Sequence, residues 1–64
     1  MSLEELRGLP TAVSVVTAAR ALGVSRDTAY KLVRAGTFPA QTFMVGETRK
    51  VATASLWKVL DVHP

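Results

Sequence analysis

The chain has 64 residues, a net charge of +3, an apolar fraction of 48% and no cysteine. This length allows one small domain with a thin core, and the apolar fraction is too high for a disordered chain. The lack of cysteine excludes disulfides and thiolate metal sites and fits a reducing cytosol, and no apolar run approaches the ~18 residues of a membrane span.

The first predicted element is a short turn of helix within residues 2–10. Ser2 is a suitable helix cap, and Glu4 and Glu5 are favourable in a first helical turn. The same acidic pair is wrong for a signal peptide. We expect this helix to lay Leu6 and Leu9 over the core; a frayed tail is the alternative.

Two helices separated by a tight turn are predicted next. Ser14 is the expected N-cap and Gly23 the C-cap of the first helix, and Ser25 caps the second, which runs to a glycine at position 36. Apolar residues at helical spacing predict a buried face on the first helix: Val15, Ala18, Ala19 and Leu22. Val24, in the turn, is expected to be buried. This order is typical of a helix-turn-helix, with a generic helical hairpin as the alternative.

The second helix, residues 26–35, has an inner apolar face and an outer charged face. Ala29, Leu32 and Val33 form the inner face. The residues predicted on the outer face are Arg26, Asp27, Tyr30, Lys31 and Arg34. Residues 14–58 contain seven basic and two acidic residues, which gives this segment a net charge of +5. A basic helix about 15 Å long fits the major groove of DNA, although most charge runs are simply solvated faces. The Tyr30 hydroxyl either donates to a phosphate or the ring covers apolar surface.

The segment after the second helix has the alternation of a β-hairpin. Phe38 is expected in the core, Phe43 and Val45 on one face of the first strand, and Thr42 and Met44 on the other. Residues 46–48 are expected to form the turn, and Val51 to point inward on the returning strand. Arg49 and Lys50 follow the turn, so the hairpin is basic.

A last helix is expected over residues 54–62, with Thr53 as its cap and Leu56, Val59 and Leu60 facing inward. Trp57 is expected at the edge of the core against Leu6 or Leu9, with a half-exposed subunit contact as the alternative. The elements together predict a fold that is mainly α with a small β-hairpin, a minimal winged helix-turn-helix. It occupies residues 14–64, and residues 1–13 form an N-terminal extension packed on its core.

The order of residues resembles the excisionase-type DNA-binding family, which is close to the DNA-binding part of MerR-like regulators. The segment "VTAARALGVSRDTAYKLVRAG", the following "FP" and the later "VG" and "RKV" carry the resemblance, which covers residues 14 to about 60. It implies that the second helix enters the major groove and that the wing touches the DNA backbone or minor groove. It places Arg26, Tyr30, Lys31 and Arg34 on the recognition helix and Lys50 at the basic position of the wing.

The sequence departs from the family pattern in the wing. Glu47 stands at the tip, which is often basic in the family. Arg49 replaces a common aromatic residue, and Met44 lies where a basic residue is common. We therefore expect the helix to carry more of the binding than the wing. The residues expected to contact DNA are Ser25, Arg26, Asp27, Thr28, Tyr30, Lys31, Arg34, Arg49 and Lys50.

No pattern in the sequence predicts catalysis, a cofactor or a metal. His63, the only histidine, is expected to be a tail residue, and Ser14 and Ser25 have no histidine base nearby. The adjacent Glu4 and Glu5 diverge around a helix, unlike a catalytic acid pair. We expect a non-enzyme with no cofactor, no small-molecule ligand and no membrane contact.

The resemblance implies an excisionase, the architectural factor of a phage or integrative element. Such a protein binds tandem sites on double-stranded DNA beside copies of itself, bends the DNA and helps an integrase to excise the element. It acts in the cytoplasm of a bacterial host, at the nucleoid. The long dimerisation helix and effector domain of MerR-like regulators are not found in the sequence. A small repressor of the same fold is the first alternative, and a protein-interaction module for an acidic partner is the second.

Overall fold

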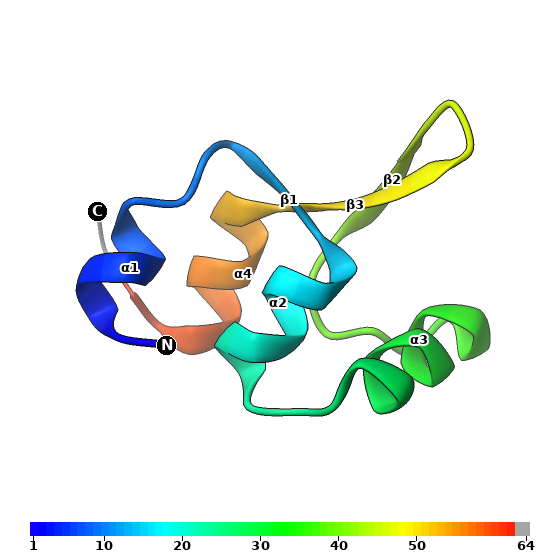
Figure 1. Cartoon of the computed structure of the whole chain (residues 1–64), viewed down its shortest axis with the longest axis horizontal. Helices are drawn as coiled ribbons and strands as arrows, with labels where there is room; N and C mark the ends of the chain where they lie inside the picture. The colour runs from blue at the N-terminus through cyan, green and yellow to red at the C-terminus, as the bar shows by residue number, and fades with distance from the viewer. Residues whose placement is uncertain (63–64) are drawn as a thin grey trace.

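The computed structural model describes residues 1–62, so His63 lies outside the described residues. In chain order the elements are α1 (Leu3–Arg7), β1 (Ala12–Ser14), α2 (Val15–Leu22), α3 (Arg26–Ala35), β2 (Thr42–Val45), β3 (Thr48–Ala52) and α4 (Thr53–Leu60) (Figure 1). None of the helices in residues 1–62 has the length and apolarity that crossing a bilayer requires. Four short helices around a small antiparallel sheet confirm the minimal winged helix-turn-helix.

Serine caps begin the first three helices, as predicted. The hydroxyl oxygens of Ser2, Ser14 and Ser25 each accept a hydrogen bond from the backbone N–H three residues later. α2 ends at Gly23, whose φ of 75° lies in the left-handed region that glycine adopts without strain. The backbone therefore turns sharply after α2, and Ser25 begins α3 two residues later.

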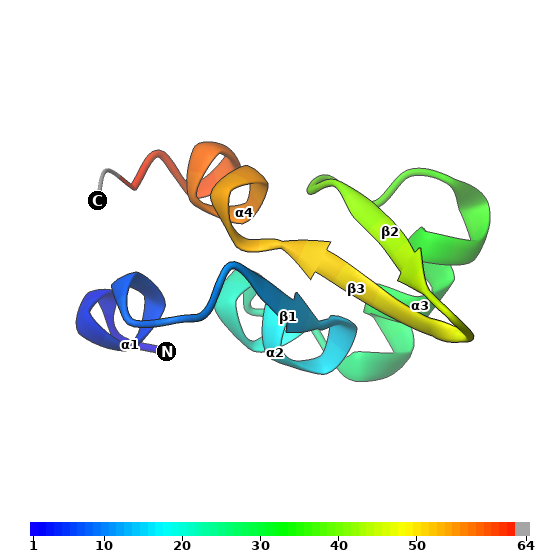
Figure 2. The same ribbon diagram turned by 90° about the horizontal axis from the view of Figure 1, so that it is seen from above.

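The sheet has three strands, not only the two of the predicted hairpin. β3 is the central strand and pairs antiparallel with β2 on one side and with β1 on the other (Figure 2). β1 pairs Val13 with Val51, and both side chains are buried on the face of the sheet that meets the core. The hairpin is thus joined directly to the segment that precedes α2.

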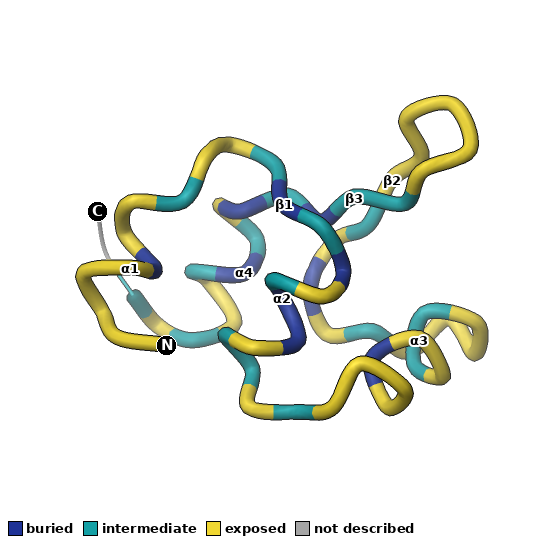
Figure 3. Tube along the Cα trace, viewed as in Figure 1, coloured by how far each residue is buried: buried dark blue, intermediate teal, exposed yellow. Residues whose placement is uncertain are grey.

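The core lies between α2, the sheet and α4 (Figure 3). Val15, Val51 and Leu56 are its largest fully buried side chains. Ala18 and Ala29 are also fully buried, and small side chains at these positions let α2 and α3 approach closely. Val24 and Phe38, which we predicted to be buried, are instead only half-buried at the edge of this cluster, because each follows a helix end at the surface of a small domain.

Two predictions for the last helix are wrong. Thr53 is not its cap: the N-cap is Ala52, which makes no side-chain cap, and the Thr53 hydroxyl donates to the carbonyl of Pro10. The chain passes from β3 straight into α4, so Thr53 is buried against the N-terminal segment. Val59 is 44% exposed, because the buried stripe of α4 is narrow and centres on Leu56.

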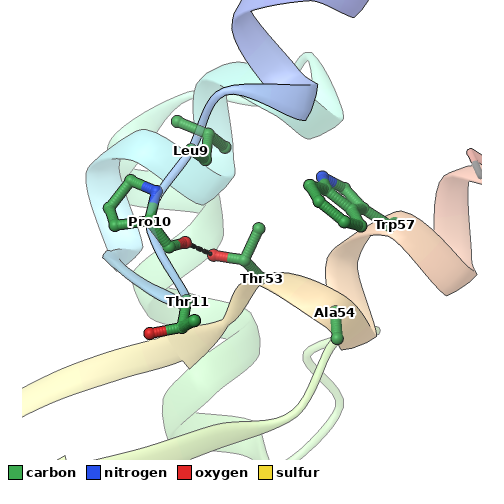
Figure 4. Close-up of a pocket in the computed structure, with 6 residues that line it drawn as sticks. All are labelled: Leu9, Pro10, Thr11, Thr53, Ala54 and Trp57. Atoms are coloured by element: carbon green, nitrogen blue, oxygen red, sulfur yellow. Dashed lines mark hydrogen bonds between the residues drawn. The ribbon is translucent and has the colours of Figure 1, made fainter. Parts of the chain in front are cut away.

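The N-terminal extension is fastened to α4 by backbone acceptors. The indole Nε1–H of Trp57 donates to the carbonyl of Leu6 over 2.9 Å, and Leu6 itself is buried. The backbone N–H of Thr53 donates to the carbonyl of Thr11 over 3.0 Å. A shallow apolar cavity of about 140 Å³ lies where the extension meets α4, lined by Leu9, Pro10, Thr11, Thr53, Ala54 and Trp57 (Figure 4).

Replacing Trp57 tests whether the extension stabilises the fold. Trp57→Phe keeps an aromatic ring but removes the hydrogen bond to Leu6, so we expect the free energy of unfolding to fall by about 1 kcal/mol. Urea denaturation followed by circular dichroism measures this change. Val59→Thr on the exposed side of the same helix is the control and should stay within about 0.5 kcal/mol of the wild type. Equal losses in both variants would contradict the assignment.

Candidate nucleic-acid interface

α3 and the β2–β3 hairpin project from the same end of the molecule, away from α1 (Figures 1 and 2). Ala29 anchors α3 on α2, with Leu32 and Val33 half-buried beside it. The opposite side of α3 is therefore open to solvent over the whole length of the helix. The two elements that a winged helix-turn-helix uses to contact DNA lie together at one end of this fold.

The exposed side of α3 carries an excess of positive charge. Arg26, Lys31 and Arg34 are exposed, and Asp27 is the only acid among them. Within the described residues none of these four side chains makes a hydrogen bond or an ion pair. Cations without internal partners keep their full capacity to pair with phosphates or with the acceptor atoms of guanine. The structure thus places these predicted contact residues on one accessible face.

The first turn of α3 is rigidly capped. The Ser25 hydroxyl accepts from the Thr28 backbone N–H over 3.1 Å and donates to the Thr28 hydroxyl over 2.9 Å. Both hydroxyls therefore hold the start of the helix, and Arg26 follows directly as its first residue. Tyr30 also lies on α3 and is 38% exposed, so part of its side chain stays accessible to a ligand.

A two-residue turn closes the hairpin. Gly46 has a φ of 62° and Glu47 does not have a positive φ, which is the pattern of a type II′ turn. Thr48, which we predicted in the turn, is paired with Val45 instead, because a two-residue loop matches the twist of the flanking strands. At the base of the hairpin the Gln41 backbone N–H donates to the Ser55 hydroxyl of α4 over 2.9 Å, which ties the wing to the body.

Arg49 and Lys50, predicted together as the basic part of the wing, point to opposite faces of the sheet. Arg49 lies on the same face of the sheet as Val51, which is buried in the core. The Nη1 of Arg49 donates to the Thr42 hydroxyl over 3.1 Å. Lys50 lies on the outer face, directly opposite Phe43 of β2. Of these two side chains, only that of Lys50 makes no hydrogen bond within residues 1–62. The structure does not bring these two cations together on one surface.

The end of β2 in the wing carries exposed apolar side chains, which were not predicted as a surface from the sequence. Phe43, Met44 and Val45 are 38%, 50% and 57% exposed. The signal was present in the sequence as three consecutive large apolar residues next to a predicted turn. An alternating strand with one buried face would have had a polar residue among them.

The comparison with family models matches residues 13–60 to the family described as "Helix-turn-helix domain". That range begins in β1 and ends at the last residue of α4, so it takes in α3 and the whole hairpin. Comparisons with curated proteins and with solved structures find no match. Three quarters of the chain, including every element of the exposed basic end, follow the family pattern. The chain is therefore a DNA-binding member of the helix-turn-helix domain family.

Proposed function

We propose that this protein is an excisionase, a DNA-binding factor without enzymatic activity that acts in the cytoplasm of a bacterial host. It binds double-stranded DNA at adjacent sites beside copies of itself, bends the DNA and promotes integrase-mediated excision of a phage or integrative element. The resemblance of residues 14–60 to excisionase-type domains supports this assignment, and the small size of the end formed by α3 and the hairpin supports binding at tandem sites.

The size of the interface carries the argument for tandem sites. The longest dimension of the molecule is 28 Å, which is shorter than the ~34 Å helical repeat of B-DNA. α3 has 10 residues and so offers only about 15 Å of helix to the major groove. A single module of this size buries about 600–1,000 Å² on DNA, which gives modest affinity. Neighbouring copies on adjacent sites supply the missing contacts.

Within this function α3 reads the base edges, and Lys50 of the wing provides a contact of low sequence information. Arg26 is the first residue of α3, and helix-turn-helix proteins insert the N-terminal part of the recognition helix into the major groove. Arginine donates two parallel hydrogen bonds to guanine. Lys50, on the outer face of the wing, meets phosphate or the edge of the minor groove.

Arg26→Ala and Lys50→Ala separate reading from anchoring. We expect Arg26→Ala to weaken binding to the preferred site by about 1–3 kcal/mol and to relax base preference at one or two positions. Lys50→Ala should weaken binding to all DNA sequences alike. It should also reduce the slope of log K against log salt concentration by about one unit. Selection from a randomised duplex library, followed by titration of the enriched duplex at several salt concentrations, measures both effects. A changed preference in Lys50→Ala with an unchanged one in Arg26→Ala would make the wing the reader.

A two-part experiment tests the function itself. Titration of duplexes that carry one, two or three adjacent copies of the enriched site should show affinity per site rising with copy number. Addition of the protein to a reaction containing its integrase and an integrated substrate should increase excision, and Arg26→Ala should reduce that increase. Equal affinity per site and no effect on excision, together with strong binding to an operator, would favour a repressor instead.

A further inference from the structure

β2 is an edge strand that exposes apolar side chains on both of its faces. It pairs with β3 alone, so its other side has no partner strand. Phe43 and Val45 point to one face and Met44 to the other, and each is more than a third exposed. An exposed apolar edge strand is an aggregation hazard that proteins normally suppress with charge or proline. Its presence here indicates a surface that is covered when the protein works.

Because apolar side chains are exposed on both faces of β2, a groove in the partner covers them better than a flat surface does. A flat partner surface covers one face of a strand and leaves the other in water. A narrow groove contacts both faces and the edge at the same time. The minor groove of undistorted B-DNA is about 6 Å wide, so it must widen to admit the strand, and proteins that insert apolar side chains there between neighbouring base pairs deform the duplex in this way.

The basic residues beside β2, and the position of the hairpin next to α3, point to DNA as the partner that supplies this groove. Arg49 and Lys50 are the cross-strand neighbours of Met44 and Phe43, so positive charge borders the apolar run. The hairpin projects from the same end of the fold as α3 (Figure 1), whose Arg26, Lys31 and Arg34 are exposed. Glu47 at the turn repels phosphates, so ionic attraction to the backbone does not hold the tip of the wing.

We propose that the outer part of the wing, residues 43–45, is an apolar wedge that enters the minor groove beside the α3 site and unstacks a base step. The inference rests on the proposed DNA-binding function and deepens it, because it assigns the bending of DNA to Met44 and Val45. It also makes the wing a source of specificity without base hydrogen bonds. Pyrimidine–purine steps unstack most easily, so the preferred site carries such a step under the wing.

The test compares a polar wing with a matched control. The double variant Met44→Gln, Val45→Thr keeps side-chain size and β-propensity but removes the apolar surface. Val59→Thr makes the same exchange at a valine of similar exposure on α4. Each protein is titrated onto the duplex enriched by the wild type, and onto the same duplex with a mismatch at the step under the wing. Energy transfer between dyes at the duplex ends reports the bend.

A wedge predicts three results. The wild type and Val59→Thr bend the matched duplex by at least about 20° and bind the mismatched duplex at least about tenfold more tightly, because its step is already unstacked. The double variant loses most of the bend. It also gains less than about twofold from the mismatch, a ratio that stays measurable if its overall affinity falls.

Other results overturn the proposal and identify which part fails. A double variant with the bend and the mismatch gain of the wild type shows that the wing is no wedge, while the DNA-binding function stands. A double variant that keeps the bend at one site but loses cooperativity at adjacent sites shows that the apolar wing contacts a second copy. A wild-type protein that enriches no duplex contradicts the proposed function and the wedge together.

Discussion

The pairing of β3 with both β1 and β2 is the constraint on which the rest of this structure depends. Through β1 the central strand is joined to the segment that leads into α2, and so to α3, which packs on α2. Through β2 it forms the wing, and its last residue leads directly into α4. Val51, at the centre of this pairing, is fully buried between Val13 and the core. The separation of wing and α3 is therefore fixed by a few backbone hydrogen bonds in a very small domain.

Local signals in the sequence were sufficient for α2 and α3 but not for β1. Serine caps and the left-handed Gly23 act within a few residues, so the positions of α2 and α3 could be predicted. β1 could not, because its three residues pair with a strand far along the chain and its last residue also caps α2. Val59 was misassigned because helical spacing gives the direction of a buried stripe but not its width.

The same distinction applies to the candidate site. The exposure of the α3 cations could be predicted from helical spacing, because Ala29, Leu32 and Val33 define the inner face of the helix. The division of Arg49 and Lys50 between two faces is a matter of strand register, which depends on tertiary pairing. The bond from Arg49 to Thr42 needed that register too. In the proposed function, charge on the helix and apolar surface on the wing give the two elements different tasks, sequence reading for α3 and DNA deformation for the hairpin.

The central claim is that the end of the fold formed by α3 and the hairpin is the surface that meets DNA. Nuclear magnetic resonance of the labelled protein, titrated with a short duplex that contains the enriched site, tests it most directly. The account predicts that the largest amide shift changes fall in residues 25–34 and 42–50, with those of α1 and the exposed side of α4 nearly unchanged. The largest changes in α1 and α4, with α3 unaffected, would contradict it.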